Sequence, residues 1–411
     1  MTTLPAHRGP LDGSLPAPEP GSRRAEIALA AAEEFTLRGY HSTRVEHIAE
    51  RLAVTPGALY RHVQGKYEMF RDAVFTLVVE LDAAAGTGDL EALVDAVTRA
   101  TLVHRSRGAL YRWHGRYLSP EDRAAVTAVF EQIRSRVTDA VRAHRTGLDV
   151  DPRGSGSAAG AILAAVASLG DHRVAVEPDD AVALMTAIAR DLAAWTPGPP
   201  PAPAADTSSA RFSAAPSPAV PRLRGGAATR EAALSAAIAR FHLSGYDDVT
   251  MEDIGADVGV NASALYRHFP GKSALLAAAV SRTAAFVERI LDEHAALHAP
   301  GDDPAEVLDD LLGGYVTVAL SHGPELMLYH SELGTLEPDD RRRLRRSQRA
   351  QLDRWAGLLR EAVPGTSDET ARIRVHAALA IVLDGGRMVG YHPAAGGRFG
   401  ELARIPLRPG D

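Results

Sequence analysis

An internal repeat constrains this chain more than any other feature. A shift of 206 residues places residues 24–74 over residues 230–280 without a gap, and 19 of the 51 aligned positions are identical. A second match, at a shift of 218, places residues 118–123 over residues 336–341. One structural unit therefore occurs twice in the chain. The length of 411 residues suits this arrangement, because an ordinary domain takes about 150 residues.

The composition places both copies in one fold class. Apolar residues recur at spacings of three and four, for example at Leu234, Ile238 and Phe241, which is typical of an amphipathic helix. Eight prolines lie among Ala, Ser and Gly in residues 197–221, and prolines also crowd the N-terminus. We therefore predict an all-α protein with a flexible tail at residues 1–21 and a Pro/Ala-rich linker at residues 196–226.

The first copy begins with two predicted helices. Gly39 follows a helix over residues 24–38 and can adopt the positive φ that ends a helix. Thr43 and Glu46 have the spacing of a capping box, which predicts a second helix over residues 44–52.

A third short helix follows in each copy. It is predicted over residues 56–63 in the first copy and over residues 262–269 in the second, where Thr250 caps the preceding helix. Two short helices joined by a tight turn make a helix-turn-helix.

The same string of residues marks both copies. The first copy carries Gly39-Tyr40, Ile48-Ala49, Val54, Ala58-Leu59-Tyr60-Arg61-His62 and Lys66. The second copy carries Gly245-Tyr246, Ile254-Gly255, Val260, Ala264-Leu265-Tyr266-Arg267-His268 and Lys272. This string resembles the TetR family of bacterial transcriptional regulators. Val63 and Gly255 depart from the family's usual Phe and Ala, and a usual member has one such motif per chain.

The resemblance implies the same domain order in each copy. A three-helix DNA-binding domain is expected at residues 22–75 and again at 227–281. Each is expected to lead into a helical ligand-binding and dimerisation domain, at residues 76–195 and 282–405. The chain would then hold the two DNA-binding units that the family usually assembles from two subunits.

The resemblance also implies which side chains meet DNA. Residues that open the recognition helix face base edges, and flanking residues contact phosphates. The candidates in the first copy are Thr43, Arg44, Thr55, Pro56, Gly57, Tyr60, Arg61, His62 and Lys66. Those in the second copy are Thr250, Asn261, Ala262, Ser263, Tyr266, Arg267, His268 and Lys272.

Lysine usage and local charge refine this expectation. Lys66 and Lys272 are the two lysines among 45 basic residues, and they occupy matching positions of the repeat. A compact ammonium suits a point contact such as a phosphate. Residues 22–75 carry eight basic and seven acidic side chains, and residues 222–282 carry seven and six. We expect few phosphate contacts for each unit and a mild salt dependence.

Other functions find little support in the sequence. The chain has no cysteine, so thiolate chemistry is excluded. It also lacks a glycine-rich phosphate loop and a nucleophile elbow. His294 and His298 have helical spacing, but no third metal ligand is identifiable. We expect no catalytic activity, cofactor or metal.

Aromatic and polar residues behind each motif are candidates for an effector pocket. They are Trp113, His114 and Tyr117 in the first half, and Tyr329 and His330 in the second. Ordinary helix packing explains each of them equally well.

We therefore predict a cytoplasmic, ligand-responsive repressor that binds a double-stranded DNA operator through two recognition helices of one chain. It is expected to bind a small-molecule effector, to have no membrane partner and to be a monomeric pseudodimer, with a homodimer as the competing state. Three functional alternatives stay open: a second unit that serves assembly only, a helical small-molecule-binding protein or enzyme without DNA binding, and an activator.

Overall fold

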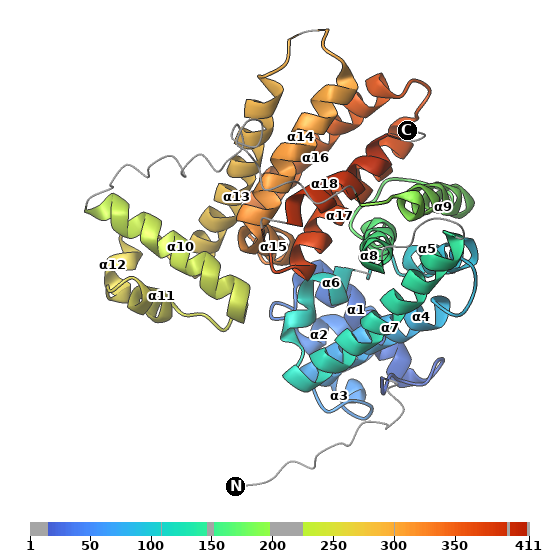
Figure 1. The fold of residues 1–411 in the computed structure, drawn as a ribbon. Helices are drawn as coiled ribbons and strands as arrows, with labels where there is room; N and C mark the ends of the chain where they lie inside the picture. The colour runs from blue at the N-terminus through green and yellow to red at the C-terminus, as the bar shows by residue number, and fades with distance from the viewer. Residues whose placement is uncertain are drawn as a thin grey trace.

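The computed structural model describes residues 15–107, 109–145, 152–197, 225–299, 301–392 and 395–408. Every regular element in these ranges is a helix, as the sequence predicts (Figure 1). Within the same ranges, no helix is both long and apolar enough to cross a membrane. Most of the predicted linker and N-terminal tail lies outside the described residues.

The first half consists of a small helical domain and a larger one. The small domain contains α1 (Arg23–Arg38), α2 (Val45–Arg51) and α3 (Pro56–Leu59). The larger domain contains α4 (Lys66–Ala84), α5 (Leu90–Val103), α6 (Ala109–His114), η1 (Gly115–Tyr117), α7 (Pro120–His144), α8 (Pro152–Ser168) and α9 (Pro178–Ala194). Because α4 starts beside α1 and continues into the second domain, it joins the two directly.

The second half repeats this order. Its small domain contains α10 (Gly226–Ser244), α11 (Met251–Asp257) and α12 (Ala262–Tyr266). The larger domain contains α13 (Lys272–Ala295), α14 (Pro304–Ser321), α15 (Gly323–Glu332), α16 (Pro338–Ala362), α17 (Asp368–Met388), α18 (Gly396–Arg404) and η4 (Ile405–Leu407). The small domain has its own apolar core, built around Phe241, Ile254 and Leu265.

The two halves pack on each other through their larger domains. Helix α8 lies along α17, and α18 also contacts α8 (Figure 1). The rings of His172 and His376 stack with their centroids 4.3 Å apart across this boundary. Arg398 of α18 donates to Ser157 of α8 at 3.5 Å. The apolar faces of the two halves are thus buried within one chain.

The local structure differs from three predictions. The cap of α2 is Arg44, whose backbone N–H donates to the His47 ring, so the predicted Thr43–Glu46 capping box is wrong. The recognition helices end earlier than predicted, at Leu59 and Tyr266. Leu15 is buried in the core, so the part of the tail nearest α1 is packed.

Candidate nucleic-acid interface

The turn between the second and third helices has the same hydrogen bond in both copies. The N–H of Val54 donates to the carbonyl of Ala49 at 3.0 Å, and Val260 donates to Gly255 at 2.9 Å. The residue before each valine has positive φ, at 54° for Ala53 and 71° for Gly259. This left-handed residue reverses the chain and directs the next helix outward.

Gly255 is explained by the same turn. A Cβ atom at this position would lie 2.6 Å from the carbonyl oxygen of Val260. The close approach of Val260 in the second copy therefore suits Gly255, whereas the same turn in the first copy accommodates Ala49.

The residues that open the two recognition helices present different chemistry. Thr55 precedes α3 with an exposed side chain that makes no capping hydrogen bond. Asn261 caps α12, because its Oδ1 accepts from the N–H of Ala264 at 3.0 Å and from Ser263 Oγ at 2.7 Å. The side-chain NH₂ of Asn261 is left to donate outward.

The residues that close the recognition helices are exposed in both copies. Tyr60 is 53% exposed and Tyr266 is 50% exposed. Arg61 and Arg267 follow them, also exposed, and neither guanidinium forms a hydrogen bond or ion pair with another described residue. Each copy therefore offers an aromatic hydroxyl and an unpaired guanidinium side by side.

The two histidines that come next differ. His62 is exposed, whereas His268 is half-buried. A Cβ atom at Gly226 would lie 3.2 Å from the His268 ring, so this ring packs against the start of α10.

Each of the two lysines binds a loop of the small domain in its own half of the chain. Lys66 Nζ donates to the carbonyl of His41 at 2.8 Å, and Lys272 Nζ donates to the carbonyl of Asp247 at 3.1 Å. The ammonium also lies over the ring of Tyr40 in the first copy, 4.8 Å from its centroid, and over Tyr246 in the second, at 4.4 Å. Matched lysines thus hold matched loops, and burial lowers the pKa of Lys66.

Thr43 does not lie where the sequence suggests. It is completely buried, and its hydroxyl donates to the carbonyls of Glu34 and Gly39 at 3.0 and 2.7 Å. The repeat itself contains the clue, because Thr43 aligns with buried Val249, whereas Arg44 aligns with Thr250. Arg44 and Thr250 are exposed at the start of the second helix, and we leave Thr43 out of the interface.

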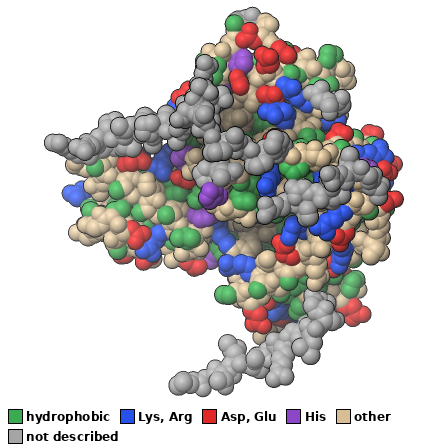
Figure 2. Space-filling view, in the orientation of Figure 1, with side chains coloured by type: hydrophobic (Ala, Val, Ile, Leu, Met, Phe, Trp, Pro, Cys, Tyr) green, Lys and Arg blue, Asp and Glu red, His purple; other side chains and the backbone are tan. Residues whose placement is uncertain are grey.

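The two small domains meet at equivalent positions of the repeat. His41 Nδ1 lies 3.6 Å from the Asp247 carboxylate, and these residues are related by the shift of 206. Contact between equivalent residues is the arrangement expected beside a two-fold axis. On the face seen in Figure 2, basic and acidic side chains are interspersed, in keeping with the near-neutral charge counts.

The structure separates the five candidate pocket residues. Tyr329 and His330 line a cavity of about 120 Å³ in the second half. Trp113 instead stacks on His330 across the boundary, with centroids 4.7 Å apart, and donates to Asp171. His114 is buried, and Tyr117 donates to Glu332 at 3.1 Å. None of these three first-half residues is among the lining residues of the three cavities described, and a place for them in an effector pocket stays a prediction.

The other histidine candidates have partners of their own. His298 lies 2.9 Å from Asp310 and 3.4 Å from Asp302, and His294 is buried against Gly314. Among the described residues, no group of three or more His, Asp or Glu side chains is arranged to hold a metal ion.

This geometry defines a class of protein, one with two helix-turn-helix domains in tandem. A family model described as bacterial regulatory proteins of the tetR family matches residues 27–73 and again 233–279. The chain is thus a tandem TetR-like protein, with one family match in each half.

Individual relatives match shorter parts of the chain. Over 48 residues, the chain is 40% identical to the HTH-type transcriptional activator FasR of Mycolicibacterium smegmatis. This match covers 12% of the chain and 22% of FasR. The chain therefore spans about a fifth of the length of this curated relative.

Solved structures of TetR-family regulators also resemble part of the chain. PfmR from Thermus thermophilus is 22% identical, with a TM-score of 0.35, and the match covers 40% of this chain and 96% of PfmR. A tetR-family regulatory protein from Rhodococcus RHA1 is 22% identical, with a TM-score of 0.38, and the match covers 43% of this chain and all of that protein.

Proposed function

We propose that this protein is a DNA-binding transcriptional regulator that contacts one operator with both helix-turn-helix domains of a single chain. The observation that carries the proposal is the matched pair of exposed, unpaired arginines, Arg61 and Arg267, each behind a recognition helix. An exposed guanidinium beside a helix that enters the major groove is placed to bind a phosphate.

The pairing of the two halves supports the use of both domains. Because α8 packs on α17 within the chain, the two small domains are carried on one body. The contact of His41 with Asp247, at equivalent positions of the repeat, supports a pseudo-two-fold arrangement of these domains. A symmetric pair of helix-turn-helix domains suits two half-sites one helical turn apart.

The two half-sites are proposed to differ. The exposed NH₂ of Asn261 suits an adenine edge in the major groove, whereas Thr55 is a more permissive contact. The operator is then an imperfect palindrome.

Regulation by a small-molecule effector is part of the proposal, with repression as the direction we favour. Cavities in both larger domains support the effector site. Activation is the competing direction, since FasR is an activator.

Selection of bound sequences from random duplex DNA with the purified chain tests the proposal. We expect enrichment of one site with two unequal arms. Absence of any enrichment would overturn the DNA-binding proposal. Enrichment of a single arm would favour the alternative in which the second unit serves assembly only.

A further inference from the structure

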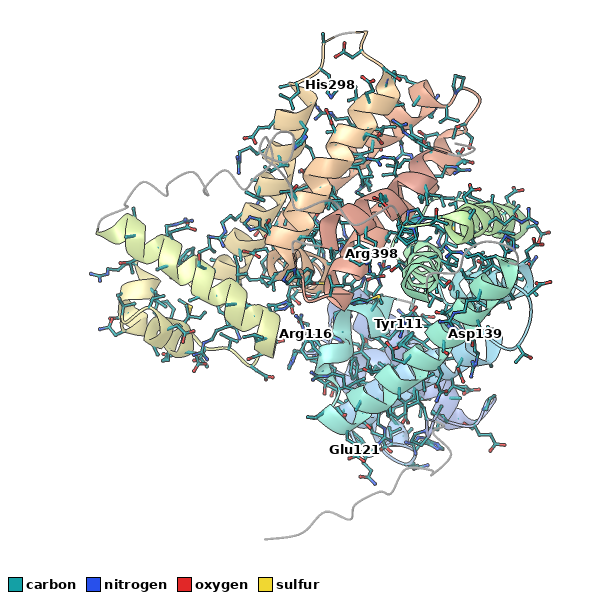
Figure 3. The ribbon with its side chains drawn as sticks, viewed as in Figure 1. Tyr111, Arg116, Glu121, Asp139, His298 and Arg398 are labelled. Atoms are coloured by element: carbon teal, nitrogen blue, oxygen red, sulfur yellow. The ribbon has the colours of Figure 1, made fainter. Side chains whose placement is uncertain are left out.

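The larger domain of the first half contains a cavity of about 310 Å³ with an apolar interior. Buried apolar side chains from four helices form its wall, among them Leu81, Val97, Val126, Ile133 and Ala164. Tyr111, labelled in Figure 3, belongs to the lining on α6. Such an interior favours an apolar ligand group of modest size.

Charged side chains belong to the lining of this cavity, and Arg112, which is buried, pairs with Asp171 and Asp384. Four arginines and two carboxylates are among its lining residues. Arg134 pairs with Glu131, and Arg387 lies 3.1 Å from Asp384. Arg123 is exposed, donates to the carbonyls of Arg116 and Leu118, and forms no ion pair with a described residue. The lining therefore carries excess positive charge at Arg123.

The second half contributes directly to the same lining. Asp384, Arg387 and Met388 of α17 line the cavity together with residues of the first half. Arg387 also donates to the carbonyl of Arg112 at 2.9 Å. A molecule seated here contacts both halves across the packing of α8 on α17.

We propose that this cavity binds an amphipathic carboxylate, with its apolar tail inside and its carboxylate at Arg123 and Arg387. The proposal rests on the proposed function and names the chemical class of the effector. A guanidinium binds a carboxylate through charge-assisted hydrogen bonds, and the buried apolar wall excludes water from the tail.

The cavity of the second half has a different chemistry. Its lining includes Tyr315, Tyr329, His330, Gln348 and Gln351, and its volume is about 120 Å³. Arg112 lines both cavities. The smaller and more polar site does not suit an alkyl tail, so the proposal assigns the carboxylate to the first half alone.

Titration calorimetry of the full chain with decanoate tests the proposal, with decan-1-ol and decyltrimethylammonium as charge controls. We expect one decanoate per chain and binding at least about tenfold weaker for both controls, because neither control can accept charge-assisted hydrogen bonds as a carboxylate does. Arg123→Gln should weaken decanoate binding about tenfold. Arg142→Gln, on the same helix outside the cavity, should change it less than twofold.

Cavity-filling variants locate the site. Ala164→Phe should abolish decanoate binding, whereas Ala380→Phe, which fills the other cavity, should preserve it. No binding of decanoate, equal binding of the cationic control, or loss of binding in Ala380→Phe alone would overturn the proposal. If Ala164→Phe does not fold, the effect of Arg123→Gln on decanoate affinity decides the test, and unchanged affinity would overturn the proposal. The calorimetry contains no DNA. A failure to bind decanoate would therefore overturn the effector proposal alone, and selection of bound sequences tests DNA binding separately.

Discussion

The guanidinium of Arg116, which is labelled in Figure 3, binds the carboxylate of Glu332 and so joins the two halves of the chain. Arg116 also donates to Ser331 Oγ at 2.9 Å and to the carbonyl of Phe241, near the end of α10, at 3.4 Å. Burial raises the pKa of Glu332 and the charge of Arg116 opposes that rise. This junction connects the larger domain of the first half to the small domain of the second half.

Removing Arg116 should be costly, since it leaves Glu332 charged, buried and without its cation. We expect Arg116→Ala to lower the free energy of unfolding by about 3 kcal/mol. In the Arg116→Ala background, Glu332→Gln should recover part of this loss. Arg142→Ala removes an exposed ion pair with Asp139 and should cost less than about 1 kcal/mol. Denaturant titration of these variants measures the difference, and equal losses for Arg116→Ala and Arg142→Ala would contradict the junction's role.

The stacked histidines between the halves should make stability depend on pH. Burial lowers the pKa of His172 to about 2 and that of His376 to about 4. In the unfolded chain a histidine titrates near about 6.5. Between pH 6.5 and 4 the unfolded state therefore binds more protons, so stability falls as the pH is lowered.

The variant His376→Gln isolates this effect. It should reduce the slope of unfolding free energy against pH by about 1.4 kcal/mol per pH unit in that window. His144→Gln, at an exposed position on α7, should leave the slope unchanged. Thermal or denaturant unfolding at several pH values provides the measurement, and parallel curves for wild type and His376→Gln would count against the explanation.

Substitutions at the two left-handed turn residues should change stability in opposite directions. Ala53 and Gly259 occupy matching positions with positive φ. Ala53→Gly should stabilise the first domain by about 0.5 kcal/mol, because relief of the strained backbone exceeds the added entropy of the unfolded chain. Gly259→Ala should destabilise the second domain by about 1 kcal/mol. Two changes of the same sign in unfolding experiments would refute this assignment.

Substitution of the exposed arginines and of the hydrogen-bonded lysines should affect DNA affinity and stability differently. Arg61→Ala and Arg267→Ala should each weaken binding to all sequences and reduce the salt slope by about 0.9 without loss of stability. Lys66→Ala and Lys272→Ala should weaken binding as well, but also lower stability, since each lysine holds a loop carbonyl. Affinity at two salt concentrations and unfolding of the same variants separate these outcomes. Unchanged affinity in both arginine variants would exclude them as phosphate contacts.

Much of the local fold could be predicted from the repeat. Gly39 and Gly245 have positive φ of 81° and 84° as expected after a helix, and the helix-turn-helix lies at the predicted positions in both copies. These features depend on residues close in the sequence, where cap and turn preferences act.

The contacts between the halves could not be predicted in this way. Trp113 stacks on His330, and Arg123 shares a cavity with Arg387, although each pair is far apart in the sequence. Neither spacing nor composition specifies which faces of distant helices meet, because many pairings bury similar apolar area. The sequence misplaces Thr43 at the surface for a related reason: Thr suits both a helix cap and a buried hydroxyl that donates to a carbonyl.

The mass of the protein–DNA complex tests the central claim most directly. The chain has a mass of 43.6 kDa, and the claim is that its two domains together occupy one operator. Light scattering of the free chain and of its complex with the selected duplex should give one chain in solution and one chain per duplex. Two chains on each duplex, or a stable free particle of twice the chain mass, would contradict the claim that a single chain supplies both recognition helices.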